Sequence, residues 1–128
     1  MLSNRFLRTA VAFFVAGVAL GIYMGMREDF RFAHVHAHLN LLGWVALGLS
    51  GLIYASHPQL QRGGWAEAHY WLHTLGLLLF MGGFVWGTVT GVFAFVPVAL
   101  GAAMALGVLI FAVNVFTGLG ARVQRGTP

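Results

Sequence analysis

Apolar residues fill four long stretches of this chain, and the polar residues gather in the short intervals between them. The stretches cover residues 6–26, 30–56, 65–95 and 97–119. Each reaches the length of about 20 residues that a helix needs to cross a bilayer core. Backbone groups in lipid must find hydrogen-bond partners within their own segment, so helices are expected rather than strands. The pattern predicts an all-α membrane protein with a single four-helix domain over residues 1–128.

Residues that commonly begin or end helices lie at the predicted boundaries. Asp29 is expected to cap the second helix, and His57-Pro58 to end it. Pro97 lies in the first turn of the fourth helix, so the connection before it is very short. The third and fourth helices should therefore form a tight antiparallel hairpin. The first stretch is too long for the apolar region of a signal peptide and is predicted to be a retained helix.

The arginines indicate the orientation in the membrane. An even number of spans puts both termini on one side. That side and the loop between the second and third helices carry most of the arginines: Arg5, Arg8, Arg62, Arg122 and Arg125. On the other side, Arg27 and Arg31 are offset by two adjacent acidic residues. The positive-inside rule then predicts a multi-pass protein of the cytoplasmic membrane with both termini in the cytoplasm.

The composition excludes several classes of protein. Hydrophobic residues make up 59% of the chain and charged residues 8%, whereas soluble domains are about 25% charged. Cysteine and lysine are absent, which excludes disulfides, thiolate metal sites, iron–sulfur clusters, covalently attached haem and Schiff-base chemistry. The net charge of +4 comes from dispersed arginines. No nucleic-acid partner is expected, because such a site needs a clustered basic face.

Glycines recur at every fourth residue in two of the predicted helices. The two sets are Gly17, Gly21 and Gly25 in the first helix, and Gly83, Gly87 and Gly91 in the third. Small residues at this spacing let helix backbones approach closely in lipid. The favoured interpretation is packing within one chain, and the alternative is contact between copies in an oligomer.

Six histidines form two groups in this apolar chain. His34, His36 and His38 lie in the outer third of the second helix, and His57, His69 and His73 lie toward the opposite face. Ionisable residues in membrane spans are costly and mark candidate functional sites. At 1.5 Å per residue, the two groups are separated by about 15 Å along the membrane normal. One metal centre within a single chain is therefore not expected to take ligands from both groups.

The directions of the outer histidines limit what they can bind. Successive helix residues turn by about 100°, so His34 and His38 share a face and His36 points nearly the opposite way. A closed zinc or copper site needs three or four converging ligands, whereas haem needs one imidazole per face. One helix cannot supply both axial ligands of one iron, and no other predicted helix carries histidine at this depth. If these residues bind haem through two histidines, the second must come from another copy of the chain.

Other interpretations of single histidines stay open. His34 lies near the headgroups, where a hydrogen-bonded interfacial residue is an equal alternative to a ligand. His57 is expected to be a loop residue beside Pro58. His69 and His73, four residues apart, either clamp a metal ion or form the amphipathic start of a helix.

The run Ala33–Trp44, AHVHAHLNLLGW, resembles the histidine-bearing helices of the haem–copper oxidase subunit I superfamily. That family includes the cbb3-type oxidases, the nitric oxide reductases and related NnrS-like membrane haem proteins. Its catalytic subunits have twelve helices in three four-helix arcs. The resemblance therefore implies that three copies of this chain, a homotrimer, rebuild the twelve-helix ring.

The resemblance also implies a cofactor and its ligands. In the family, a His-x-His pair on one helix ligates two neighbouring haems, and His36 and His38 match that spacing. His38 of one copy would face His36 of the next across a haem b near the outer leaflet, with His34 as the alternative second ligand. Arg27 and Arg31 would pair with the haem propionates.

The implied activity is electron transfer or chemistry of a diatomic gas, O2 or NO, with a quinol or a redox protein as donor. Oxidoreductase activity of the haem–copper oxidase type stays open, because the chain has no adjacent His-His pair for a second metal. One rival is a copper- or zinc-binding or transporting membrane protein with a histidine cluster at each mouth. Another is an accessory subunit of a respiratory complex whose histidines are incidental.

Overall fold

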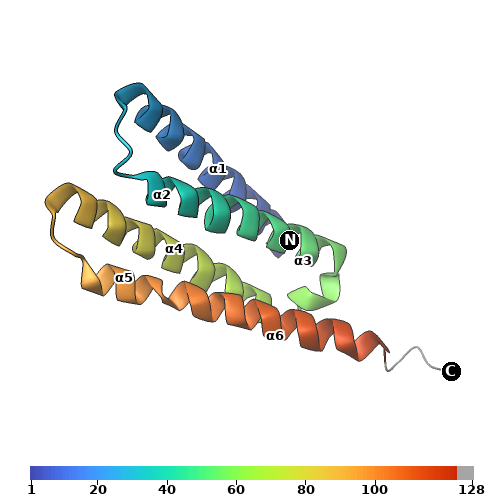
Figure 1. The fold of residues 1–128 in the computed structure, drawn as a ribbon. Helices are drawn as coiled ribbons and strands as arrows, with labels where there is room; N and C mark the ends of the chain where they lie inside the picture. Colours follow the sequence, from blue (N-terminus) through green and yellow to red (C-terminus); the bar gives the residue numbers. More distant parts are fainter. Residues whose placement is uncertain (124–128) are drawn as a thin grey trace.

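A computed structural model describes residues 1–123 of the protein, with side chains placed through Gly120. The regular elements of this part are helices, arranged as two long hairpins (Figure 1). Four segments are long and apolar enough to cross a membrane: Leu2–Arg27, Ala33–Ser56, Trp65–Thr90 and Phe95–Gly120. The predicted set of four spans, and with it a multi-pass membrane protein, is confirmed.

The first helix, α1 (Leu2–Arg27), begins four residues before the predicted start at residue 6. Polar contacts hold this extra turn. The Arg5 guanidinium lies 2.6 Å from the Glu67 carboxylate, and the Ser3 N–H donates to Gln61 at 3.3 Å. At the other end, Glu28 adopts a left-handed conformation with a φ of 51°, and its N–H bonds to the Gly25 carbonyl. The helix therefore ends at Arg27, one residue later than predicted.

The second span begins at Ala33, so the predictions of a start at residue 30 and of an Asp29 cap were wrong. The Asp29 carboxylate instead accepts hydrogen bonds from the backbone N–H and the guanidinium of Arg31. Phe32 occupies the capping position and offers no side-chain acceptor. The ion pair has diverted the carboxylate from the helix.

The second span is not a uniform α-helix. It consists of α2 (Ala33–His38), a π-helical segment η1 (Leu39–Ala46) and α3 (Leu47–Ser56). The sequence analysis did not anticipate the π-helical segment. His57 follows α3, and Pro58 opens the short 3₁₀ helix η2 (Pro58–Gln61), which confirms the predicted end of this span.

The third span, α4 (Trp65–Thr90), ends five residues before the predicted residue 95. Gly91 ends the helix because its φ of 72° is left-handed, and its N–H bonds to the Gly87 carbonyl. The fourth span begins at Phe95 rather than Pro97 and is interrupted at Ala102 between α5 (Phe95–Gly101) and α6 (Ala103–Val123). The predicted hairpin of the third and fourth spans is confirmed.

The hairpin of α1 with α2–α3 meets the hairpin of α4 with α5–α6 near the end that carries the N-terminus and η2 (Figure 1). Aromatic rings fill this contact, with Phe6 5.1 Å from Tyr54 and 5.0 Å from His69, measured between ring centroids. Asn114 of α6 donates to the Leu60 carbonyl of η2 at 2.8 Å. The start of α1 and the last described turn of α6 lie at this same end, as an even number of spans requires. Arg125 lies outside the described residues, as does the side chain of Arg122.

The glycines of the first helix pack within the chain. A Cβ atom at Gly17 would lie 2.5 Å from the Asn40 amide, and one at Gly21 would lie 2.8 Å from the His36 ring. In α4, a Cβ atom at Gly83 would lie 2.8 Å from Val98. Packing inside one chain, the favoured interpretation, therefore holds for these three positions.

Candidate functional site

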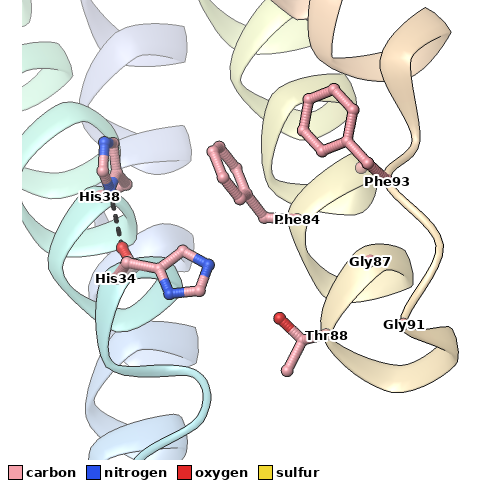
Figure 2. A pocket seen from close by; sticks show the side chains of 8 residues that line it. His34, His38, Phe84, Gly87, Thr88, Gly91 and Phe93 are labelled. Carbon is pink, nitrogen blue, oxygen red and sulfur yellow. Dashed lines mark hydrogen bonds between the residues drawn. The ribbon is translucent and has the colours of Figure 1, made fainter.

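A cavity of about 430 Å³ lies between α2 and α4, at the end where α1 joins α2 (Figure 2). Two imidazoles and one hydroxyl provide its polar side chains, and the remaining lining is apolar or glycine. The lining residues are His34, His38, Gly83, Phe84, Gly87, Thr88, Gly91 and Phe93. Gly83 and Gly87 of α4, and Gly91 directly after it, add no side chain to the lining opposite the two histidines.

His38 has the hydrogen bonding of a metal-binding histidine. Its Nδ1 lies 2.7 Å from the His34 carbonyl oxygen, a bond drawn in Figure 2. A carbonyl only accepts, so Nδ1 carries the proton and the neutral ring keeps a lone pair on Nε2. Metal-ligating histidines characteristically donate their second ring nitrogen to a carbonyl or carboxylate in this way. The ring lies near two aromatic residues of α4, 5.9 Å from Phe80 and 6.4 Å from Phe84 between centroids.

His34 shares the cavity with His38, because residues four apart lie on one helical face. Its ring meets Phe84 edge-on, with 4.9 Å between centroids and an interplanar angle of 70°. Figure 2 shows the His34 ring directed toward Phe84 and Thr88. The side chain is exposed, as an interfacial residue would be.

His36 lies on the opposite side of α2, which confirms the predicted divergence. Its Nδ1 lies 2.8 Å from the Gly17 carbonyl oxygen, and the ring packs on Gly21 of α1. As in His38, this bond leaves Nε2 with a free lone pair. The structure therefore brings His34 and His38 to one cavity and keeps His36 half-buried against α1.

The two arginines expected near a cofactor do not line this cavity. Arg27 is the exposed last residue of α1. Arg31 pairs with Asp29, with 2.7 Å between guanidinium and carboxylate. The hydrogen bonds from Arg31 hold the pKa of Asp29 below its ordinary value of 3.8, and the same bonds raise the pKa of Arg31. Arg31 is thus engaged on the loop between the first two spans.

The inner histidines form a buried hydrogen-bonded chain that the sequence analysis missed. His57 lies at the end of α3, with its Nδ1 3.2 Å from the Ile53 carbonyl, in agreement with a loop position. His69 and His73 are each only 1% exposed. Tyr54 contacts His69, His69 contacts His73, and His73 contacts the Leu42 carbonyl. The spacing of four between the two histidines was the sequence signal, but their partner Tyr54 comes from another helix.

The side chain of one inner histidine reaches toward the outer group. His73 Nε2 lies 3.0 Å from the carbonyl oxygen of Leu42, which is four residues after His38. Within the described residues, no group of three or more His, Cys, Asp or Glu side chains converges on a metal position.

Comparison with curated proteins finds similarity to the cbb3-type cytochrome c oxidase subunit CcoN1 of Stutzerimonas stutzeri. The two are 29% identical over 89 residues, which cover 60% of this chain and 19% of that subunit. This chain thus corresponds to about a fifth of the length of the relative. No family model and no solved structure matches the sequence. The partial match supports the resemblance to haem–copper oxidase subunit I.

Proposed function

We propose that this protein is a membrane haem b protein in which His38 binds the iron in the cavity between α2 and α4. One observation carries the proposal: the His38 Nδ1 bonds to the His34 carbonyl, which leaves Nε2 free on a side chain that lines an apolar cavity. Neutral imidazole is a common ligand of haem iron, and a fixed tautomer strengthens it as a ligand. The partial similarity to a cytochrome c oxidase subunit favours a respiratory role.

The cavity walls suit a flat, largely apolar group. Phe84 and Phe93 offer aromatic surface, and Gly87 and Gly91 leave room that larger side chains would fill. Arg27 and Arg31 lie at the same end of the molecule, where α1 is joined to α2. Their guanidinium groups are available to bind the propionates, and Arg31 would exchange Asp29 for a propionate. When bound, the haem would supply a reversible one-electron centre. The chain's own residues hold it, orient it and exclude water.

The second axial ligand requires another copy of the chain. His34 shares a face with His38, and His36 faces α1, so one chain cannot ligate both sides of one iron. We therefore propose a homotrimer, with His36 or His34 of a neighbouring copy completing the site near the outer leaflet. Both termini would lie in the cytoplasm. Two axial histidines favour electron transfer from a quinol or a redox protein, whereas an open sixth position favours O2 or NO chemistry.

The rival functions make different demands on the site. A closed copper or zinc site inside one chain lacks the converging ligands it needs among the described residues. An accessory subunit would bind no chromophore at all. The absorption spectrum of the purified protein separates these possibilities from haem binding.

The test is the His38→Ala variant purified in detergent. Wild-type protein should give a reduced low-spin b-type spectrum with about one haem per chain, and His38→Ala should lose the bound haem. His57→Ala is the matched control, because this histidine also bonds to a carbonyl of its own helix but lies far from the cavity. It should retain full occupancy.

Two outcomes would change the proposal. Full haem occupancy in His38→Ala would remove His38 as the axial ligand. A colourless wild-type protein after haem supplementation would exclude the haem function and leave copper or zinc binding and the accessory role. His36→Ala should give a five-coordinate haem if His36 of a neighbour is the second ligand, and an unchanged low-spin spectrum would assign that role to His34.

A further inference from the structure

The inner histidine chain joins the two hairpins across the middle of the molecule. The Tyr54 hydroxyl of α3 lies 3.1 Å from His69 Nδ1, and His69 Nε2 lies 3.3 Å from His73 Nδ1. His73 Nε2 then lies 3.0 Å from the Leu42 carbonyl oxygen in the π-helical segment η1. Phe6 and Phe111 pack on the His69 ring, at 5.0 and 4.8 Å between centroids. The chain is enclosed in apolar side chains.

The Leu42 carbonyl determines which ring nitrogen of each histidine in this hydrogen-bonded chain carries the proton. The carbonyl only accepts, so His73 Nε2 is the donor and the Nδ1 of the neutral ring accepts. His69 Nε2 must then donate, which makes its Nδ1 the acceptor for the Tyr54 hydroxyl. A proton wire would need an exit at its end, and a backbone carbonyl offers none. This hydrogen-bonded chain is therefore suited to holding the η1 backbone in place rather than to conducting protons.

What the chain holds is a carbonyl of η1. A π-helical turn pairs residue i with i+5 and is rare in proteins. Leu42 lies in this segment, a few residues before α3 begins at Leu47. The bond from His73 ties the Leu42 carbonyl to the other hairpin.

The π-helical segment also sets the direction of the cavity histidines. It begins at Leu39, directly after His38. Replacing it by a regular α-helix would shift α2 relative to α3 by about one residue, or roughly 100° of rotation. The core anchors α3 through Tyr54 and α2 through Val35, so η1 sets the rotation of one anchored helix relative to the other. A rotation of α2 relative to α3 would turn His34 and His38 out of the cavity.

We propose that His73, held in a hydrogen-bonded chain with His69 and Tyr54, is a positioning residue that pins η1 and thereby aims His38 into the cavity. The positioning of a ligand rests on the proposed haem function, whereas the pinning of η1 does not. The two parts are tested by separate measurements.

The first measurement is amide hydrogen exchange of the haem-free protein over residues 39–46. His73→Leu removes the donor and should speed exchange there about tenfold, the effect of losing one buried hydrogen bond. His73→Gln keeps a donor at the reach of Nε2 and should restore slow exchange. His57→Leu, the matched control outside η1, should behave as wild type. Equal exchange in His73→Leu and wild type would overturn the pinning.

A second variant covers the case in which His73→Leu does not give monodisperse protein. Tyr54→Phe keeps the ring packing and removes only the first donor of the chain. It should leave His69 Nδ1 without a donor, visible in the ¹⁵N shift of that nitrogen, and raise exchange over residues 39–46 severalfold. Unaltered ring shifts and exchange in Tyr54→Phe would contradict the proposal.

The second measurement is the electron paramagnetic resonance spectrum of the bound haem. His73→Leu should alter the spectral signal that depends on the orientation of the axial histidine. His73→Gln should bring this signal back toward that of wild type. An identical signal in His73→Leu and wild type would contradict positioning of His38. If wild-type protein binds no haem, the haem function fails, while the exchange measurement still decides whether His73 pins η1.

Discussion

His36 and His38 show how two identical residues, two positions apart, acquire different surroundings on one helix. Each Nδ1 bonds to a backbone carbonyl, that of Gly17 for His36 and that of His34 for His38. Both rings thus present a free Nε2, but only His38 lines the cavity opposite Phe84. The difference follows from the turn of about 200° between them, because α1 covers one side of α2 and α4 the other. Whether a histidine of α2 can bind a cofactor in the cavity therefore depends on the side of the helix on which it lies.

At the same scale, Asp29 is expected to titrate below 3.8 in the folded protein, because hydrogen bonds from Arg31 stabilise its carboxylate. The pair is exposed, so it stabilises the fold only weakly. That contribution is present above the ordinary pKa of Asp29 and is lost as pH falls through the lowered pKa. Carboxyl-carbon NMR in detergent measures the midpoint. Arg31→Gln should raise it toward 3.8, and Arg27→Gln should raise it less; an unchanged midpoint in Arg31→Gln would contradict the pairing.

At the scale of the elements, the two hairpins differ in how closely the backbones of their helices approach one another. In the second hairpin, a Cβ atom at Gly76 would lie 2.6 Å from the backbone nitrogen of Met104, and one at Gly101 would lie 2.6 Å from the Cα of Phe80. Backbone cannot move aside as a flexible side chain can. In the first hairpin, the atoms that a Cβ would meet at Gly17 and Gly43 belong to side chains, those of Asn40 and Phe13. The contact of α4 with α5 and α6 is therefore the less tolerant one.

Gly76→Ala should accordingly destabilise the protein by about 1–3 kcal/mol, the typical effect of overpacking a close contact. Unfolding in mixed detergent micelles, followed by circular dichroism, measures the loss. Gly82→Ala is the matched control, because it lies on the same helix and a Cβ atom there meets nothing within 4 Å. Equal stability of the two variants would show that α4 and α6 are not packed this closely.

At the scale of the whole molecule, the hairpins meet at one end (Figure 1), and the cavity lies at the other end. The joined end carries the aromatic and histidine core, with Tyr54, Leu60 and His69 at most 1% exposed. The outer surfaces are largely apolar, as lipid contact or contact with other copies requires. One chain has no second histidine that faces His38 across the cavity.

The assembly is therefore expected to contain three chains and about three haems. Native mass spectrometry from detergent, with haem loss at increasing collision energy, measures both numbers. His38→Ala should give trimers without haem if helix contacts rather than the haem hold the ring together. A monomer that carries one six-coordinate haem would exclude ligation shared between copies.

The sequence by itself determined the number of spans, the end of the second span at His57-Pro58 and the opposite directions of His36 and His38. Each depends on local chemistry: the apolar length needed in lipid, the restriction before proline and the helical turn per residue. The haem ligands and the trimer stay predictions. The start of the second span at Ala33 was not predicted, because the Asp29 carboxylate could accept hydrogen bonds either from a helix N-terminus or from Arg31.

Only the tertiary structure decided the π-helical segment, the burial of His69 and His73, and the cavity. The Leu42 carbonyl finds its donor 31 residues away on another helix, and Tyr54 meets His69 across the two hairpins. The cavity likewise joins α2 to the glycine face of α4. Apolar periodicity specifies which segments enter the membrane, whereas a polar group inside it takes whichever partner the packing of other helices brings within reach.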